Sequence, residues 1–276
     1  MKFSRMTQRN KSEIRSNSPL SEAQILEVAP SIFSEDKHGS RSDRYTHIPT
    51  IDVLRGLKKQ GFQPFMVCQA KARDEGKHQF AKHMIRLRHA EQISQGEAQE
   101  IILLNSHDGA SSYQMLSGAF RFVCSNGLVC GDMQNDIRIK HQGDVLDNVI
   151  EGAFRVLQDF ETSDAQIDGM KSLTLNTGEA NAFAHAALAL RYDDETKPAP
   201  ITEAQILRPR RAEDTGTDLW TTFNVVQESF MRGGLRSRSA NGRKATTREI
   251  SGIGQSLSLN RALWTLADEM RKLKAA

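Results

Sequence analysis

Apolar and polar residues alternate along much of the N-terminal half of the chain, a pattern typical of half-buried β-strands. In the clearest run, Ile85 and Leu87 fall on one face while Arg86 and Arg88 fall on the other. Because Asn-Gly and Asp-Gly turns separate the later runs, we expect an antiparallel meander of about four strands over 82–141. The runs that predict strands are 44–48, 62–71, 82–89, 100–105, 111–123 and 136–141.

Beyond Gly143 the apolar residues recur at helical spacing instead. The spacing predicts helices over 144–170, 179–191, 218–232 and 257–273, with shorter helices after Ser21, Thr50 and before Pro209. Small polar residues that can cap a helix precede several of them, namely Ser21, Thr50, Thr177 and Thr202. The predicted fold class is α+β, with a mixed, mostly antiparallel sheet in the N-terminal half and a helical C-terminal half.

The order of these elements predicts how the chain is organised. Residues 1–17 are expected to be a flexible basic arm, 18–143 an α+β sheet region, and 144–276 a helical region packed on it in one compact domain. Within the helical region, 231–248 is rich in Gly, Ser, Asn and Thr, which predicts a mobile loop.

Charge is distributed unevenly, although the 276 residues carry 37 Lys and Arg against 34 Asp and Glu, a net charge of +3. The sharpest basic cluster is 231–248, which holds six Lys and Arg and no acidic residue. Basic residues on Gly-rich backbone bind phosphates by releasing counterions. The alternative is a solvated basic loop, or a contact to the acidic half of the same protein or of another subunit. The candidate nucleic-acid-binding residues are Arg86, Arg88, Arg121, Arg138, Lys140, Arg232, Arg236, Arg238, Arg243, Lys244 and Arg248.

Several classes of protein are disfavoured by composition. No apolar run approaches the roughly 20 residues that span a bilayer, and the N-terminus lacks the apolar core of a signal peptide. The three cysteines, Cys68, Cys124 and Cys130, are sparse and odd in number. We therefore expect a cytoplasmic protein with no membrane partner, in which Cys124 and Cys130 are buried as small hydrophobic residues.

One polar cluster, Asn105 to Gly109, follows a strongly apolar strand. His107 could act there as a general base oriented by Asp108. The alternative interpretation is a hairpin corner, in which Asp108 and Gly109 make the turn and the neighbouring polar side chains satisfy strand ends.

The histidines of the meander offer a second candidate site. His83, His89, His107 and His141 could converge on a metal ion, although a histidine on each of several strands is more often a polar edge. Cys124 and Cys130 are separated by five residues, which does not match a zinc knuckle. No phosphate-binding Gly-rich motif is present, so we expect no cofactor and no nucleotide-hydrolysing activity.

A string of motifs nevertheless resembles a known family. The segments KHMIRLRH, IILLNSHDGASSYQMLSGAFRFVCSNGLVCGD and IRIKHQGD resemble the plasmid- and phage-associated family called domain of unknown function 932. The resemblance covers about 25–270 and is most specific over Asn105 to Asp132. It implies an uncharacterised protein with a role in DNA maintenance, recombination or evasion of host defence.

Three functions remain open from these observations. The leading hypothesis is a non-enzymatic nucleic-acid-binding protein of a mobile element that contacts DNA, single- or double-stranded, and forms homo-oligomers, by analogy with single-strand annealing proteins. The second is a hydrolase or nuclease that uses His107 and Asp108. The third is an inhibitor that binds a host protein through its acidic segments.

Overall fold

The structure is a computed structural model that describes part of the chain. The described residues are 12–35, 47, 49–71, 75–89, 97–108, 111–122, 126–130, 136–139, 144–192, 199–238 and 243–275. They fall into two compact units. Unit 1 is Met1–Phe122 with Gln134–Phe160, and unit 2 is Val123–Met133 with Glu161–Ala276. Nearly all of the strand predicted over 44–48 lies outside the described residues, as do Cys124, Lys140 and His141.

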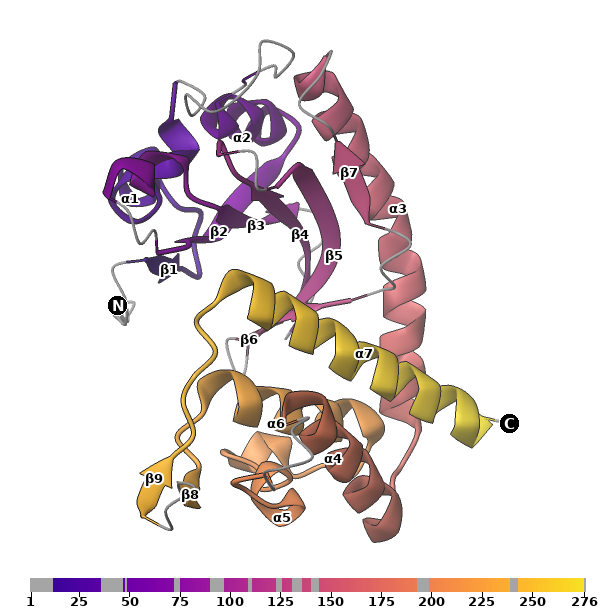
Figure 1. The fold of residues 1–276 in the computed structure, drawn as a ribbon. Helices are drawn as coiled ribbons and strands as arrows, with labels where there is room; N and C mark the ends of the chain where they lie inside the picture. Colours follow the sequence, from indigo (N-terminus) through magenta and orange to yellow (C-terminus); the bar gives the residue numbers. More distant parts are fainter. Residues whose placement is uncertain are drawn as a thin grey trace, which may run out of the picture. The chain divides into compact units, whose positions relative to one another are not determined.

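Unit 1 is built on an antiparallel sheet (Figure 1). Its described strands run in the order β1-β2-β3-β4-β5, with β7 also paired to β5. Every pairing within this set is antiparallel, which confirms the predicted sheet. The strands are β1 (Glu13–Arg15), β2 (Phe62–Gln69), β3 (His83–His89), β4 (Glu97–Asn105), β5 (Tyr113–Arg121) and β7 (Ile137–Ile139).

The helices of unit 1 are short, except the last. They are α1 (Glu22–Val28), the 3-10 helices η1 (Pro30–Phe33) and η2 (Glu75–Phe80), α2 (Thr50–Lys59), and the first part of α3 (Val145–Ser172). One core joins one sheet face to α2 and α3, as the period-2 and helical patterns predict. Each fully buried aliphatic side chain there contributes roughly 1.5–3 kcal/mol. The buried residues of this core include Val53, Leu57, Val67, Ile85, Leu87, Ile101, Leu103, Val149 and Val156.

Unit 2 is mainly helical, as predicted. It contains the rest of α3 together with α4 (Thr177–Arg191), α5 (Glu203–Ile206), the 3-10 helix η5 (Ala212–Asp214), α6 (Leu219–Arg232) and α7 (Ile253–Ala275). Strand β6 (Asn126–Val129) lies against α7. Aromatic packing joins α6 to α7, since the Trp220 ring centroid lies 6.4 Å from that of Trp264. No helix in the described residues has the length and apolarity needed to cross a membrane.

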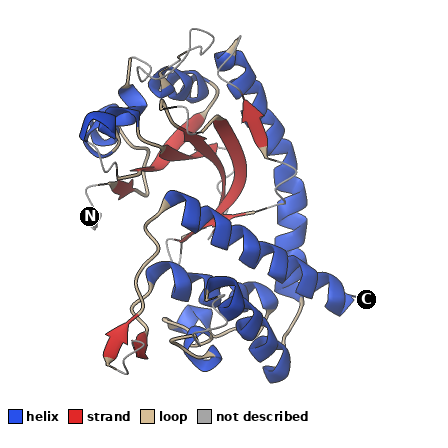
Figure 2. Ribbon diagram, viewed as in Figure 1, coloured by secondary structure: helices blue, strands red, loops and turns tan. Residues whose placement is uncertain are grey.

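Two short strands occupy the segment that was predicted to be a loop. β8 (Arg236–Arg238) and β9 (Lys244–Thr246) pair antiparallel and form a two-stranded ribbon that projects from the helices of unit 2 (Figure 2). Gly and Asn are depleted in strands and Ser favours turns, so the composition of this segment favours a loop although its two ends pair. Strand β1, at the end of the predicted arm 1–17, also differs from the prediction, because its partner β2 is about 50 residues away in the sequence.

Three local predictions differ from the structure in detail. Thr50 is the first residue of α2 rather than its cap. Helix α4 is capped by Asn176, not Thr177, in a capping box with Glu179. The pairing of β4 with β5 ends at Leu104 and Gln114, so the connection is longer than a tight Asp-Gly hairpin. The predicted caps Ser21 and Thr202 are confirmed.

Candidate functional site

The β8–β9 ribbon collects its basic side chains on one face. The register places Arg236 opposite Thr246 and Arg238 opposite Lys244. Directly opposed residues share a face, and residues two apart on one strand share it as well. Arg236, Arg238 and Lys244 therefore lie on the same face of the ribbon, and all three are exposed.

Backbone hydrogen bonds fix the base of this ribbon. Gly234 N donates to Thr247 O at 2.8 Å, and Thr247 N donates to Leu235 O at 2.9 Å. Farther from the strands, Ile250 N donates to Met231 O at 3.0 Å, which ties the end of α6 to the segment leading into α7. The segments that precede β8 and follow β9 therefore remain paired beyond the short strands themselves.

Gly233 allows the two backbone segments to approach closely at the base of the ribbon. Its φ of +58° is in the region that favours glycine. A Cβ atom at this position would lie 2.5 Å from the carbonyl carbon of Arg248. Arg210 Nη2 donates to the Gly233 carbonyl oxygen at 2.6 Å. The position therefore requires glycine both for its backbone conformation and for space.

Arg232, at the end of α6, belongs to an ion-pair network. Its Nε lies 3.1 Å from Oε1 of Glu228, a buried carboxylate that also accepts a hydrogen bond from Arg211. Arg211 Nη1 in turn donates to Asp214 at 2.6 Å. Arg232 is thus partly neutralised within unit 2. Arg232, Arg243 and Arg248 are all exposed.

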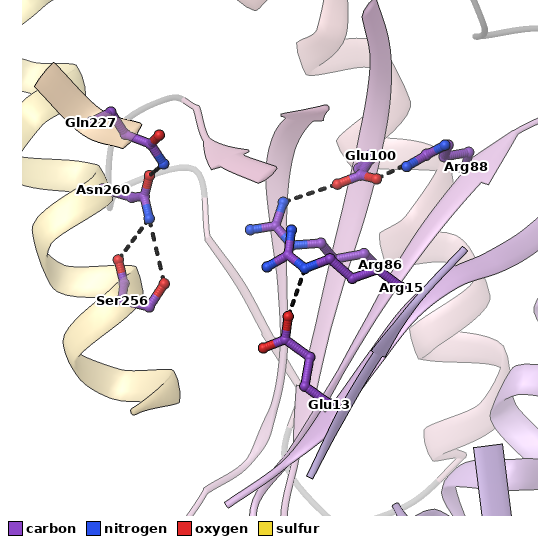
Figure 3. Close-up of polar contacts among 8 residues, drawn as sticks. All are labelled: Glu13, Arg15, Arg86, Arg88, Glu100, Gln227, Ser256 and Asn260. Atoms are coloured by element: carbon purple, nitrogen blue, oxygen red, sulfur yellow. Dashed lines mark hydrogen bonds and ion pairs between the residues drawn. The ribbon is translucent and has the colours of Figure 1, made fainter. Parts of the chain in front are cut away.

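The two arginines of β3 lie in the interior, not on a phosphate-contacting surface. Arg86 Nη1 and Arg88 Nε each donate to Glu100 on β4 at 2.9 Å (Figure 3). The exposed fractions are 3% for Arg86, 2% for Arg88 and 0% for Glu100. Their prediction as nucleic-acid contacts is corrected accordingly, because a side chain must reach the surface to contact a phosphate.

Arg88 is enclosed by aromatic rings as well as by its carboxylate. Its guanidinium carbon lies 4.3 Å from the Phe65 ring centroid and 4.0 Å from that of Phe120, which is a cation–π arrangement. Burial lowers the pKa of Arg88, and the charge of Glu100 opposes that shift. The environment of Arg88 is that of a structural ion pair.

The remaining described candidates of the sheet, Arg121 and Arg138, belong to unit 1. Arg121 is half-buried at the end of β5, where its register partner is Glu97. Arg138 is exposed on β7, opposite Gln114 of β5. Neither belongs to the unit that carries the ribbon. Among the candidates that the structure describes, Arg236, Arg238 and Lys244 share one basic face.

A buried polar cluster surrounds Thr50 in unit 1. The Thr50 hydroxyl accepts a hydrogen bond from Asn105 Nδ2 at 3.0 Å. The same oxygen lies 2.9 Å from His83 Nε2, 3.2 Å from His107 Nε2 and 3.4 Å from the Tyr113 hydroxyl. All five side chains are 0% exposed. The cluster satisfies polar groups inside the fold, as buried polar groups require.

His83 is held on both ring nitrogens. Its Nδ1 lies 2.8 Å from Ser31 Oγ and 3.1 Å from the Ala81 carbonyl oxygen, while Nε2 faces Thr50. Burial lowers the pKa of His83 to about 4, so the imidazole is neutral at pH 7. Sequence patterns did not reveal this cluster, because its members come from segments up to 63 residues apart.

The proposed catalytic pair therefore has an interior histidine. His107 is fully buried, and its backbone N–H donates to Phe80 O at 3.1 Å, while Asp108 is half-buried. The His107 ring packs against those of His47 and His83, with centroid separations of 4.7 and 5.4 Å. Within the described residues, no three His, Cys, Asp or Glu side chains are arranged to hold a metal ion.

Among the remaining candidates, His89 and the two described cysteines, Cys68 and Cys130, make packing contacts. The His89 ring packs edge-on against Phe62 at 5.1 Å between centroids. Cys130 is buried, as predicted, and Cys68 is a buried free thiol whose pKa burial raises to about 12. A thiol with so high a pKa is a poor nucleophile.

A second network missed from the sequence joins two helices of unit 2. Gln227 Nε2 on α6 donates to Asn260 Oδ1 on α7 at 2.9 Å, and Asn260 Nδ2 donates to the Ser256 carbonyl oxygen at 2.8 Å (Figure 3). Gln227 and Asn260 are both buried. The network fixes α7 against α6, from which the two ends of the ribbon emerge.

The amino-acid sequence of this chain is similar to those of known proteins. The family described as "Domain of unknown function (DUF932)" matches residues 37–264. Two proteins of Escherichia coli (strain K12), UPF0380 protein YafZ and UPF0380 protein YfjQ, are each 50% identical to this chain over 257 residues. That alignment covers 93% of this chain and 93% of each relative. No solved structure matches the chain.

Proposed function

The chain belongs to the family of the domain of unknown function DUF932, and from that premise we propose that it is a nucleic-acid-binding protein whose β8–β9 ribbon contacts phosphates. The family is the one that the motifs between Asn105 and Asp132 indicated. Its description assigns no activity, so the proposal rests on the chemistry of the residues themselves.

One observation carries the proposal: the exposed basic face formed by Arg236, Arg238 and Lys244. The register sets Arg238 directly opposite Lys244, and like charges in that position destabilise a strand pair. The segment 231–248 contributes no acidic residue. A bound polyanion would reduce this repulsion and gain counterion release.

The hydrolase hypothesis has less support. A general base must reach the proton that it abstracts, and His107 is fully buried. The Thr50 hydroxyl and the neighbouring rings already surround it. Nucleic-acid binding requires only exposed charge, which the ribbon provides.

The experiment is a binding titration of the full-length protein with labelled duplex and single-stranded DNA, followed by fluorescence polarisation at several salt concentrations. We expect the logarithm of the association constant to fall linearly with the logarithm of salt concentration. Absence of binding to either DNA at low salt would contradict the proposal.

A matched pair of triple variants tests the ribbon itself. R236Q/R238Q/K244Q removes three charges from the ribbon face, and the control K59Q/R155Q/K171Q removes three exposed charges elsewhere. With about 0.9 counterions released per phosphate contact, the ribbon variant should flatten the salt slope by up to about 2.7. Equal losses in the two variants would show that only net charge matters, which would refute the assignment to the ribbon.

A further inference from the structure

The shape of the ribbon points to a particular nucleic acid, and we infer that it enters the major groove of duplex DNA. This inference rests on the proposed function and specifies its substrate class. It commits to B-form duplex DNA; single-stranded DNA and duplex RNA are outcomes that would overturn it.

The first argument is one of dimensions. Paired strands lie about 4.8 Å apart, and the B-DNA major groove is about 12 Å wide, which accepts a two-stranded ribbon with its side chains. The β8–β9 pair is such a ribbon, and it projects from the helices of unit 2 (Figure 1). The groove of duplex RNA on the corresponding side is too narrow and deep for this entry.

The second argument is the division of chemistry between the two faces. One face carries Arg236, Arg238 and Lys244, whereas the other carries the small residues Ser237 and Ala245. Arginine and lysine donate to O6 and N7 of guanine, the acceptors exposed in the major groove. Along one strand the alternate positions 236 and 238 are about 6.6 Å apart, so two cations follow the direction of the groove.

The third argument concerns the side chains that single-strand binding needs. Proteins that hold single strands stack bases on aromatic rings. The segment 231–248 contains no Phe, Tyr or Trp. Its chemistry is therefore that of phosphate and base-edge contacts, not of stacking.

The first experiment compares three ligands of equal length under the same salt conditions: duplex DNA, single-stranded DNA of one of its strands, and duplex RNA of the same sequence. We expect duplex DNA to bind at least about tenfold more tightly than either competitor. Equal or tighter binding of the single strand or of duplex RNA would overturn the inference while leaving the proposed function intact. Failure to bind all three would refute the proposed function itself.

The second experiment keeps the net charge constant. In the variant S237R/R238S the arginine moves to the opposite face of β8, while the composition of the ribbon is unchanged. If the face enters the groove, affinity for duplex DNA should fall about tenfold. Unchanged affinity would overturn the inference. Thermal unfolding and circular dichroism of both proteins establish that the variant is folded.

The third experiment locates the contact on the DNA. Methylation of guanine N7 modifies the major groove, whereas methylation of adenine N3 modifies the minor groove. We expect pre-methylation at N7 to interfere with binding by the wild-type protein and to interfere less with R236Q/R238Q/K244Q. Interference confined to adenine N3 would overturn the inference.

Discussion

Glu100 is the residue on which two buried arginines depend. It accepts from Arg86 and Arg88 and is itself 0% exposed. A buried ion pair is often no more stabilising than apolar residues of the same volume, but removing one partner leaves the other charge buried and costs much more. Stability, not binding, is therefore the property that these three residues control.

We predict that Glu100→Gln lowers the free energy of unfolding by about 3–5 kcal/mol, because two guanidinium groups lose a shared carboxylate. Urea unfolding followed by circular dichroism measures this change. Glu161→Gln, at an exposed position of α3, is the control. A loss no greater than that of the control would show that the pairs are not coupled to folding.

The pH dependence of stability follows from His83. Its pKa in the folded chain, about 4, lies below the ordinary value of 6.5. As the pH falls, His83 of the unfolded chain takes up a proton before His83 of the folded chain does. The contribution of His83 to the free energy of unfolding is therefore fully present above pH 6.5 and is lost between pH 6.5 and pH 4. The contribution of this group is on the order of 3 kcal/mol.

The measurement is urea unfolding of the wild-type protein and of His83→Gln at pH 7 and pH 4.5. We expect the variant to be less stable at pH 7, because it loses contacts to Ser31 and Thr50. Its stability should fall less between the two pH values, because the titrating group is absent. Identical pH dependence in both proteins would contradict the assignment.

At the scale of elements, the base of the ribbon makes a sharp demand on sequence. Gly233 and Gly234 both have positive φ, of 58° and 76°. Only Gly233 is crowded, because a Cβ at Gly234 would have nothing within 4 Å. Comparing substitutions at the two glycines therefore distinguishes the energetic cost of the backbone conformation from that of the close approach.

We predict that Gly233→Ala destabilises the protein by more than the roughly 1–3 kcal/mol expected for an unfavourable backbone conformation, since it adds a clash with Arg248. Gly234→Ala should show the conformational cost alone. Thermal unfolding of both variants compares them. Equal effects would mean that the close approach at Gly233 has no energetic consequence.

Elements with a local signal were predictable, and those with distant partners were not. The alternation in 82–89 correctly set Ile85 and Leu87 on one face, which is the core face, and α6 ends at Arg232, as the helix predicted over 218–232 does. The same alternation could not reveal that Arg86 meets Glu100, because the register of another strand decides it. Thr50 likewise had the sequence signature of a cap, while its partners lie on distant strands.

The candidate site was predicted in part. The basic composition of 231–248 located the cluster, but the face that gathers its charges depends on pairing between β8 and β9. Charge counting could not separate Arg236 and Arg238 from Arg88, since exposure is a property of the folded chain.

At the scale of the whole molecule, the buried ion pairs of Glu100 and the basic ribbon belong to different compact units. Arg86, Arg88 and Glu100 lie in unit 1, and the ribbon with all of its base hydrogen bonds lies in unit 2. Stability of the sheet and affinity for nucleic acid should therefore respond to different substitutions.

We predict that Glu100→Gln, measured at a temperature at which it is folded, binds duplex DNA within about twofold of the wild-type affinity, because Glu100 and the ribbon belong to different compact units. R236Q/R238Q/K244Q should show the reverse, with weakened binding and little change in urea unfolding. Polarisation and unfolding data on the same preparations test both statements. Parallel changes in the two properties would show that the units are energetically coupled.

The closely packed base of the ribbon has a consequence for the entropy of association. The bonds from Gly234 to Thr247 and from Ile250 to Met231 fix the start and end of the ribbon before any ligand arrives. A preorganised element loses little conformational freedom on binding, so more of its interaction energy is expressed as affinity. Loosening that base should thus weaken the proposed complex with DNA without removing a single contact to the DNA.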